Sequence, residues 1–458
     1  MRRPITLILV ALCLVATGWG LFVFWRTSLA YNRELRIGLG KGARDQAARA
    51  VDYLSSRMGG QRVVLTEKED AHIRLEWREV SDPLDALPGL VCAVKGQPVK
   101  RRELKVEKVV ELPAGPLQRA VSQAVGLLSS QEAADAIGAQ DDLVSICAVG
   151  DLMFARGTAS VMGRAGLTYP MERVASFLSA ADVTIANLES PMGTSGSPIP
   201  GKLIWFRASP HAVEALKFAG VDGVTLANNH ILDYDTPCLM ETIQILDNAG
   251  ILHAGAGEDI QQARRPAMFE RKGLRIALLG YNEFASEHLF WSTKYPRTLL
   301  ATDSLAGTAP IDDNMIREDV QEAKEKADLV IVAFHWGQEY TNFPKPYFRR
   351  DLREIARATV DAGADVVLGF HPHAIQGFEL YKTGVIAYSL GNFVMDQKSP
   401  ITRESMMLLI YARKGEGILW FKVVPVEIRD CQPTVLAGQE AEKLMEKIQR
   451  ISTVNFAS

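Results

Sequence analysis

The sequence has few cysteines and almost no net charge, and these two features exclude several classes of protein. Five cysteines occur in 458 residues. None belongs to a CxxC pair, which argues against zinc knuckles and thioredoxin chemistry. Five is an odd number, so a disulfide framework is not indicated, although a single bridge stays open. The formal net charge is −3, so no nucleic-acid partner is expected.

The rest of the composition is typical of a globular chain with two or three domains. Hydrophobic residues make up 47% of the sequence and charged residues 23%, which is ordinary globular composition. From the alternation of strand-like and helical patterns we expect a small α+β domain of unknown role over residues 33–132. A main α/β domain is expected over residues 143–430 and a C-terminal helix over residues 437–452.

The N-terminus carries a long apolar run. Ile5–Trp25 contains 21 residues without a charge, and at about 1.5 Å per residue a helix of this length crosses a bilayer core of roughly 30 Å. Arg2 and Arg3 precede it, which favours a cytoplasmic N-terminus. We therefore expect a single-pass transmembrane signal anchor in the cell membrane, with the bulk of the chain extracytoplasmic. The alternative is a long signal peptide, cleaved near Ala30.

The main domain has the pattern of a layered α/β structure. Apolar, β-branched runs such as VSICAVGD (144–151) and DLVIVAFHWG (328–337) alternate with helical segments such as LREIARATVDAG (352–363). Strands of continuous apolar character are typical of sheets that are buried on both faces. The later runs SMMLLIYARK (405–414) and ILWFKVVPVEIRD (418–430) are predicted to pair as a hairpin.

Side chains able to bind a metal stand at the ends of most of these apolar runs. Because the carboxyl ends of strands open on one edge of an α/β sheet, we expect these side chains to converge. They are Asp151, Glu189, Asn229, His230, His335, His371 and His373. Carboxylates, an amide oxygen and imidazoles suit one or two divalent ions such as Mn, Zn, Fe or Mg. Two such ions, roughly 3.5–4 Å apart, would activate a water for hydrolysis.

Most of these residues also have an ordinary structural explanation when taken singly. The alternatives are a helix cap for Asp151, a solvated loop charge for Glu189, turn positions for Asn228 and Asn229, and a hydrogen-bonded core position for His335. His371-Pro372-His373 favours ligand geometry more strongly, because the proline restricts the backbone between the two histidines. The whole set is therefore a stronger signal than any one member.

Six stretches of the chain carry a family resemblance. They are VGDLMF (149–154), ANLESP (186–191), LANNHILDY (226–234), FHWGQEY (334–340), GFHPHAIQGFE (369–379) and YSLGNFV (388–394). In this order they resemble the CapA family of capsule-synthesis (poly-γ-glutamate synthesis) proteins, over about residues 144–430. That family belongs to the calcineurin-like metallophosphatase superfamily. The resemblance implies a two-layer β-sandwich flanked by helices, with ligands on loops at strand ends, and an N-terminal membrane anchor is frequent in the family.

The resemblance also implies a role for each candidate ligand. Asp151 and His373 would bind a first metal, Glu189 would bridge, and Asn229, His335 and His371 would bind a second metal. His230 would be the proton donor or the stabiliser of the transition state. Asn228 stands where typical phosphatases have glycine. Two departures concern the first metal: Met153 replaces a histidine, and Glu189 replaces an aspartate.

Four residues are candidates for substrate binding: Asn228, Arg207, Ser389 and Asn392. Arg207, in WFRASP (205–210), is suited to a carboxylate or phosphate through its planar guanidinium, and the alternative is a surface arginine. Ser389 and Asn392 are expected to line the same cleft, whereas Gly391 between them is expected to serve a turn.

Three functions remain open from the sequence. The first is a membrane-anchored, metal-dependent hydrolase or transferase that uses a metal-activated water on an anionic capsule or envelope polymer. The second is a non-catalytic subunit that holds polymer for the membrane subunits of a capsule synthase or exporter. Met153 favours the second hypothesis, and the retention of His230 with the other ligands favours the first. The third and least supported is a sensor that acts through residues 33–132.

Overall fold

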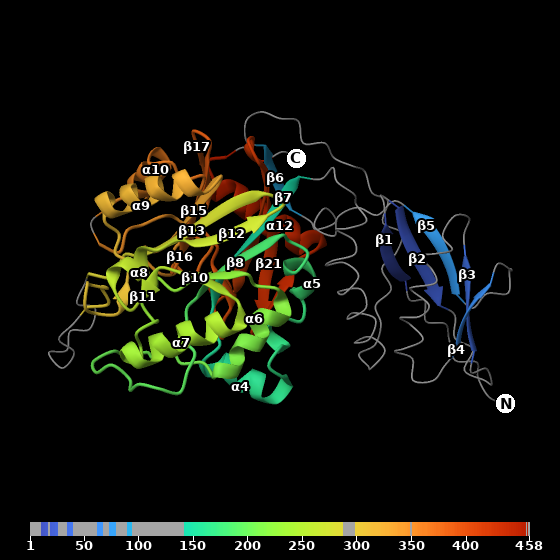
Figure 1. Cartoon of the computed structure of the whole chain (residues 1–458), viewed down its shortest axis with the longest axis horizontal. Helices are drawn as coiled ribbons and strands as arrows, with labels where there is room; N and C mark the ends of the chain where they lie inside the picture. Colours follow the sequence, from blue (N-terminus) through green and yellow to red (C-terminus); the bar gives the residue numbers. More distant parts are fainter. Residues whose placement is uncertain are drawn as a thin grey trace. The chain divides into compact units, whose positions relative to one another are not determined.

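The structure is a computed structural model in which the chain forms two compact units. It describes residues 11–16, 19–25, 34–39, 62–66, 73–78, 89–93, 142–286, 298–348, 350–454 and 456. The smaller unit comprises Met1–Ala86 and Arg101–Asp141, and the larger comprises Leu87–Lys100 and Asp142–Ser458 (Figure 1). The candidate metal ligands all belong to the larger unit.

The described part of the smaller unit is one mixed sheet with the strand order β1-β2-β5-β3-β4. Its strands are β1 (Ala11–Ala16), β2 (Trp19–Trp25), β3 (Glu34–Leu39), β4 (Arg62–Thr66) and β5 (Ile73–Arg78). Strand β3 runs parallel to β4 and β5, whereas β2 is antiparallel to β1 and β5. Strands β3, β4 and β5 fall within the α+β domain expected over residues 33–132, and the helices of that expected domain lie outside the described residues.

The helix predicted across Ile5–Trp25 is wrong for the described part of that segment, which forms strands. Strands β1 and β2 occupy it and pair as a hairpin, with Leu14 opposite Leu21. The run is rich in β-branched and aromatic residues, which favour strands, and a continuous apolar run has no periodicity that separates strand from helix. Among the described residues, no helix combines the length and apolar character that crossing a bilayer requires.

The larger unit is built on two large mixed sheets. Within the described residues one sheet has the order β10-β9-β8-β7-β20-β21-β22, with β19 beside β7 and β6 beside β21, and the other has the order β12-β13-β15-β16-β18-β17. The strands of the first sheet are β6 (Leu90–Ala93), β7 (Leu143–Leu152), β8 (Val183–Leu188), β9 (Gly223–Thr225), β10 (Leu252–Ala254), β19 (Asn392–Val394), β20 (Glu404–Arg413), β21 (Gly417–Arg429) and β22 (Gln432–Val435). Those of the second sheet are β12 (Ala267–Arg271), β13 (Leu274–Asn282), β15 (Leu329–His335), β16 (Val366–Phe370), β17 (Phe378–Tyr381) and β18 (Gly384–Ala387). A small ribbon pairs β11 (Ala256–Gly257) with β14 (Gly307–Thr308).

The two sheets pack face to face around one core. Strand β15 shows the pattern, because alternate side chains of a strand point to opposite faces. Ile331 joins a buried cluster with Ile146 of β7 and Leu408 of β20, so this side of β15 faces the other sheet. Its neighbour Val332 joins a second cluster. The continuous apolar runs are thus buried on both faces, as the sequence predicted, and each fully buried aliphatic side chain contributes roughly 1.5–3 kcal/mol.

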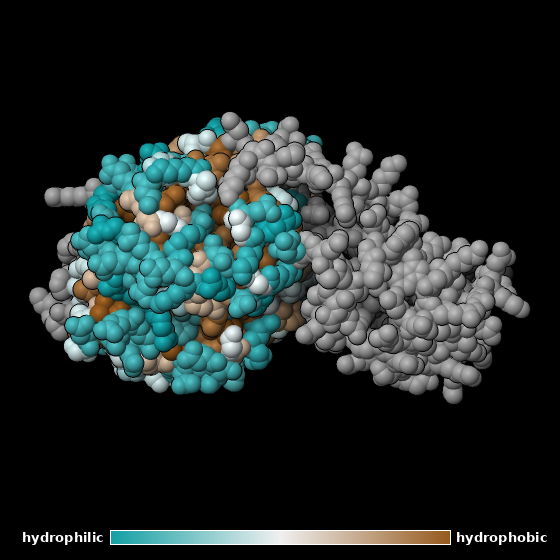
Figure 2. Space-filling view, turned by 45° about the horizontal axis from the view of Figure 1, so that its top comes forward, coloured by the Kyte–Doolittle hydropathy of each residue, from teal (hydrophilic) through white to brown (hydrophobic). Residues whose placement is uncertain are grey.

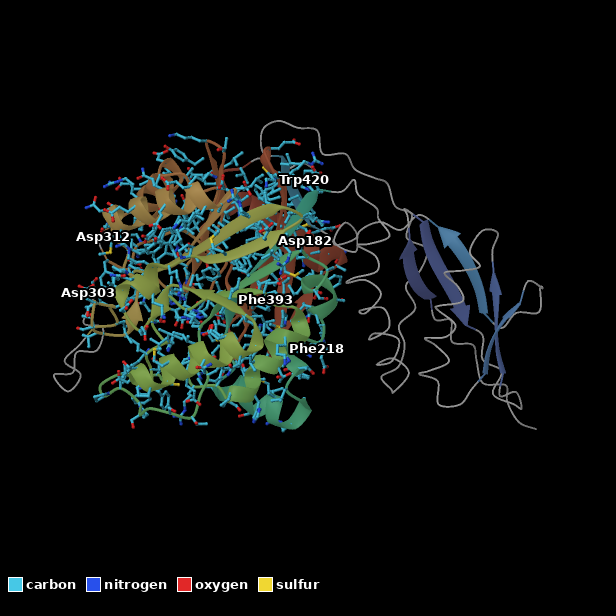
Figure 3. All side chains as sticks on the ribbon, in the orientation of Figure 1. Asp182, Phe218, Asp303, Asp312, Phe393 and Trp420 are labelled. Atoms are coloured by element: carbon cyan, nitrogen blue, oxygen red, sulfur yellow. The ribbon has the colours of Figure 1, made fainter. Side chains whose placement is uncertain are left out.

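Helices cover the outer face of the second sheet. Ile316 of α9 (Asp313–Lys326) and Ile355 of α10 (Leu352–Asp361) belong to the same cluster as Val332, and Figure 1 shows the two helices side by side. Asp312 caps the start of α9 through the Asn314 and Met315 amides. Figure 3 labels Asp312 at the outer edge of the larger unit. The same figure shows that side chains fill the space between the ribbons.

The remaining helices lie along the first sheet, at the C-terminal end of the chain and, for α8, against the β11–β14 ribbon and the second sheet. They are α4 (Arg156–Ala165), α5 (Ala175–Leu178), α6 (Val213–Ala219), α7 (Asp235–Ala249), α8 (Ile260–Arg264), α11 (Pro400–Arg403) and α12 (Gly438–Ile451), with 3-10 turns η2 (Tyr169–Met171) and η3 (Pro210–Ala212). Figure 2 shows that the visible face of the larger unit is mostly hydrophilic, with smaller hydrophobic areas between. The helical segments therefore turn polar residues to solvent, as amphipathic helices do.

Three features of the larger unit differ from the sequence prediction or add to it. Strand β6, expected beside the strands of the 33–132 domain, instead pairs with β21 of the larger unit. The expected C-terminal helix is present as α12, and it packs Leu444 and Ile448 against the core while most of its other side chains are exposed. The predicted hairpin of β20 and β21 is confirmed.

Candidate metal centre

The two buried carboxylates lie at the ends of adjacent parallel strands. Asp151 is the second-last residue of strand β7, and Glu189 directly follows β8. Asp151 pairs in register with Asn187 of β8, and the Glu189 amide donates to the Leu152 carbonyl at 2.9 Å. Neither carboxylate is exposed to solvent. The sheet register thus brings together two residues that are 38 positions apart in the sequence.

The three histidines come from the second sheet. His335 ends β15 and pairs with Phe370, the last residue of the parallel strand β16. His371 and His373 follow immediately, and His371 Nδ1 lies 3.0 Å from His335 Nε2. All three side chains are almost completely buried. The carboxyl ends of parallel strands therefore deliver them to one place.

The carboxylates and histidines of the two sheets meet in two groups that share Glu189. In the first group, ligand atoms of Asp151, Glu189 and His373 lie within 4.8 Å of one another, and in the second group the same holds for Glu189, His335 and His371. The Asn229 Oδ1 joins the second group, 3.1 Å from His335 Nε2. We refer to these six residues as the ligand cluster. The two groups match the division between first and second metal that the resemblance implies.

Unsatisfied polar atoms indicate that the ligand cluster is built for a cation. Both carboxylate oxygens of Glu189 and the Nε2 of His371 are buried without a hydrogen-bond partner among the described residues. A buried carboxylate without a partner is costly, and a bound ion is one of the few ways to offset that cost. Carboxylate, amide and imidazole donors fit a divalent ion such as Mn, Zn, Fe or Mg.

The pKa values of the cluster show the same need for positive charge. Burial, with the neighbouring Asp151, raises the pKa of Glu189 to about 8 even though His373 opposes the shift. Burial would lower the pKa of His373, but Glu189 and Asp151 outweigh it and raise that pKa to about 9. Asp151 and Glu189 thus favour a positive charge beside them, a role that a divalent cation would fill.

The backbone at the two histidines is strained. His371 has φ 93° and His373 has φ 52°, values that residues other than glycine rarely adopt. Tyr340, with φ 62°, donates its amide to the Pro372 carbonyl at 2.7 Å. Such conformations cost about 1–3 kcal/mol each and cluster at functional sites. Here the strain turns both imidazoles toward the carboxylates of the other sheet.

His230 is held by a buried aspartate that sequence reasoning missed. Its Nδ1 lies 2.7 Å from Asp233 Oδ2, and Phe206 stacks on the imidazole with ring centroids 3.9 Å apart. Lys202 forms a buried ion pair with Asp233 and donates to the Asn229 carbonyl at 2.7 Å. Burial lowers the pKa of His230 to about 4 despite the charge of Asp233. The resting imidazole is therefore neutral, with Nδ1–H donating to Asp233.

Asn187 is a second residue that sequence reasoning missed. Its amide nitrogen donates to Asp151 Oδ1 at 2.8 Å and lies 3.4 Å from His335 Nδ1. Its amide oxygen accepts a hydrogen bond from Asn228. The signal available in the sequence was a polar side chain inside an apolar strand. Groups that orient metal ligands in this way are nearly as important as the ligands themselves.

Asn228, predicted to contact substrate, instead makes hydrogen bonds within the protein at both ends of its side-chain amide. Its amide nitrogen donates to the Leu188 carbonyl at 2.9 Å, and its amide oxygen accepts the His230 amide at 3.0 Å. The residue is fully buried. It therefore ties the loop after β9 to the end of β8, which positions Asn229 and His230.

Arg207 and Ser389 are also engaged within the fold. The Arg207 guanidinium lies 3.9 Å over the ring of Tyr234, and its Nη1 is 3.3 Å from the Thr194 carbonyl. The Ser389 hydroxyl accepts the Gly391 amide at 3.1 Å. Gly391 has φ 71°, which agrees with the turn predicted for it. The structure therefore gives these two predicted substrate contacts other tasks.

Asn392 orients one ligand of the first group. Its Oδ1 lies 2.8 Å from His373 Nδ1, and its amide nitrogen donates to the Thr402 carbonyl. This bond directs His373 Nε2 toward Glu189, 3.7 Å away. The strand it starts, β19, runs so close to β7 that a Cβ at Gly150 would come 2.0 Å from the Gly391 carbonyl oxygen.

Met153 fills the position where the phosphatase pattern has a histidine. Its side chain is fully buried among Phe206, Met395 and Ile428. The thioether sulfur accepts the Ala155 amide at 3.1 Å. The first group therefore has no additional ligand from this position.

Comparison with known proteins identifies the family of this chain. Residues 145–397 match the family described as bacterial capsule synthesis protein PGA_cap. The capsule biosynthesis protein CapA of Bacillus anthracis is 32% identical over 301 residues, which cover 64% of this chain and 70% of that protein. The PGA biosynthesis protein CapA of Bacillus subtilis is 31% identical over 295 residues, covering 64% of this chain and 74% of that protein.

These matches establish the family. The chain belongs to the bacterial capsule synthesis proteins of the PGA_cap family. Among solved structures, a 5'-nucleotidase from Staphylococcus aureus in complex with alpha-ketoglutarate aligns over 67% of this chain and 58% of that one, with 14% identity and a TM-score of 0.38. That likeness is too low to define the fold or the reaction.

Proposed function

We propose that this protein is a membrane-attached, metal-dependent hydrolase or transferase with a metallophosphatase-like domain. It acts outside the cytoplasm on an anionic capsule or envelope polymer, in the manner of poly-γ-glutamate synthesis. The observation that carries the proposal is the sharing of Glu189 by two groups of ligands, with both its oxygens buried and without a hydrogen-bond partner among the described residues. The polymer context is supported by the names of the relatives.

The residues of the chain divide the chemical work among them. A divalent ion in the ligand cluster would supply Lewis-acid polarisation of the scissile bond and activation of an attacking water. Asp233 holds Nδ1 of His230, which leaves Nε2 of that imidazole to exchange a proton with the reacting groups. Lys202 forms a buried ion pair with Asp233 and so fixes this carboxylate beside His230. Asp151 and Glu189 provide the negative charge that retains the cation.

The location proposed for the protein rests on its N-terminal sequence. The uncharged run Ile5–Trp25 follows Arg2 and Arg3, a pattern that favours membrane attachment with the chain outside. Fractionation of cells that express the full chain, beside a variant without residues 1–30, tests it. We expect the full chain in the membrane fraction and exposed to added protease in spheroplasts. Equal release of both proteins into the soluble fraction would contradict membrane attachment.

Metal content tests the hydrolase. We expect one or two equivalents of a transition metal by elemental mass spectrometry in the full chain loaded with Mn or Zn. A His371→Ala/His373→Ala double variant is expected to lose the metal, whereas His253→Ala, a histidine outside the cluster that contacts Asp247, is expected to retain it. Absence of metal from the loaded wild-type protein would eliminate the proposed mechanism.

The second candidate is a non-catalytic subunit that holds polymer for a membrane synthase. It is favoured by Met153, which leaves the first group one ligand short of the phosphatase pattern. A His230→Ala variant separates the two functions. Loss of turnover and of capsule complementation with metal retained supports catalysis. Unchanged complementation by that variant supports polymer binding.

A further inference from the structure

Arg156 is placed beside the candidate site by a strained turn. It is the first residue of α4, which follows strand β7 and Asp151, and it has φ 53°. Asp396 Oδ2 accepts the Gly157 amide at 2.9 Å and lies 3.4 Å from Arg156 Nε. One carboxylate thus fixes both the left-handed turn and the direction of the arginine. A left-handed backbone is rare for arginine and is retained only where surrounding contacts enforce it.

The Arg156 guanidinium reaches His230 through one aromatic ring. Its Cζ lies 5.5 Å from the centroid of Phe206, and Phe206 stacks on the His230 imidazole at 3.9 Å. The cation–π contact holds the guanidinium without using its terminal donors. Nη1 and Nη2 have no hydrogen-bond partner among the described residues, and the side chain is 46% exposed. Arg156 therefore presents a pair of available donors over the ring that stacks on the proton-exchanging histidine.

Tyr340 borders the same space from the side of His373. Its ring centroid lies 6.1 Å from that of His373. Burial raises the pKa of the Tyr340 hydroxyl, as do Glu339 and Glu189, whereas the positive charge of Arg156 lowers it. Tyr340 is thus within electrostatic reach of both the ligand cluster and Arg156. The arginine and the two groups of ligands consequently face one region of the molecule.

The other nearby cations are already used. Arg207 donates to the carbonyls of the 194–195 loop and covers Tyr234. Lys202 is buried in its ion pair with Asp233. Neither side chain presents donors as Arg156 does. The arginine that the sequence favoured for substrate binding is therefore not the one that the geometry favours.

We propose that Arg156 binds an anionic group of the substrate, a carboxylate or a phosphate, and so positions the neighbouring bond at His230 and the ligand cluster. The planar guanidinium matches the paired oxygens of either group. This inference rests on the proposed function, since it assigns the anion-recognition residue of the same site. Arg156 acts here as a residue that selects and positions the substrate.

Binding measurements on the full chain, loaded with Mn, test the inference. Two probes are titrated calorimetrically: a γ-linked glutamate oligomer, which carries carboxylates, and 4-nitrophenyl phosphate. Arg156→Gln, Arg156→Lys and the control Arg164→Gln are compared. Arg164 is an exposed arginine in the last turn of the same helix α4. Thermal unfolding and metal content are measured for each variant.

We expect Arg156→Gln to weaken binding of one probe about tenfold or more, the loss expected when a hydrogen bond to a charged group is removed. Arg156→Lys keeps the positive charge without the paired N–H donors of the guanidinium, and its affinity is expected to lie between those of Arg156→Gln and wild type. Arg164→Gln is expected to bind as the wild type does. The probe that responds identifies the anionic group as carboxylate or phosphate.

Three results would overturn the inference: equal affinity of Arg156→Gln and wild type, an equal loss in Arg164→Gln, or no binding of either probe by wild type. Failure of the hydrolase proposal looks different. In that case metal or turnover is absent while anion binding still depends on Arg156, and the inference then applies to the polymer-holding function.

Discussion

The two groups that share Glu189 differ in the number of ligands that the chain supplies. The second group gains an oxygen from Asn229, 3.1 Å from His335 Nε2. The first group gains none from the position of Met153, which is packed in an apolar cluster. We therefore expect the second group to bind an ion more tightly than the first. One substitution just beyond strand β7 would thus leave the two proposed ion positions unequal, while the carboxylate common to both groups stays in place.

The groups also differ in how their histidines are supported. Asn392 holds His373 of the first group at 2.8 Å. In the second group, His335 and His371 contact each other at 3.0 Å, and the Asn187 amide lies 3.4 Å from His335. His373 of the first group thus has one short hydrogen bond as its support, whereas the histidines of the second group form a chain of contacts. These contributions can be measured separately with three kinds of variant. The first removes the shared ligand, the second removes a histidine of one group, and the third removes a residue that supports a histidine.

Glu189→Gln is expected to have the largest effect, because it removes the charged ligand common to both groups. Metal affinity should fall by more than roughly 100-fold at both positions, beyond the loss typical of an orienting residue. Elemental mass spectrometry after dialysis provides the measurement. Glu379→Gln is the matched control, since Glu379 is buried but paired with Arg357 and Tyr388. Retention of two ions by Glu189→Gln would break the assignment of a shared ligand.

His335→Ala and His373→Ala are expected to remove one group each. His335→Ala should abolish the tighter of two binding phases in a Mn titration, and His373→Ala should abolish the weaker phase. The reason is that each histidine belongs to one group alone. Identical titration curves for the two variants would show that the groups act as a single site.

Asn392→Ala is expected to have a smaller effect that is confined to the first group. Removing the bond to His373 frees the imidazole to rotate, and loss of such orienting contacts typically lowers metal affinity about 10–100-fold. The weaker phase of the titration should shift, while the tighter phase stays unchanged. A shift in both phases would mean that Asn392 supports the fold around the whole cluster.

Met153→His is expected to have the smallest effect and the opposite sign. It restores the histidine of the phosphatase pattern and should strengthen the weaker phase about tenfold, so that the two groups become more alike. Burying an imidazole among Phe206, Met395 and Ile428 should lower the free energy of unfolding of the metal-free protein by about 1–3 kcal/mol. Titration and chemical unfolding measure the two quantities. An unchanged weaker phase would show that residue 153 does not face the first group.

Much of the fold was predictable from local pattern. Strands β7, β15 and β16 follow from their apolar runs, and helices α9 and α10 follow from amphipathic periodicity between them. The segment Ile5–Trp25 was not predictable in this way, because a continuous apolar run fits a helix and a strand equally well. The pairing of β6 with β21 was not predictable either, since the two strands are more than 300 residues apart in the sequence.

The ligand set was predictable for a related reason. Asp151, Glu189 and His335 each stand at or just beyond the end of an apolar strand, and chain direction then places them at one edge of a sheet. Asp233 and Asn187 were missed because an aspartate near a histidine, or an asparagine in a strand, is common without any function. Arg207 was chosen over Arg156 because residue type alone does not reveal which donors are already used.

The sequence by itself determined the strands, their polar ends and, through six ordered motifs, membership of the capsule synthesis family. Only the tertiary structure decided that Glu189 is shared by two groups, that His371 and His373 adopt left-handed backbone conformations, and that Arg156 stands over the ring stacked on His230. The reason is physical. Side-chain pattern records which face of an element is buried, whereas distances between two packed sheets are set by the core that joins them.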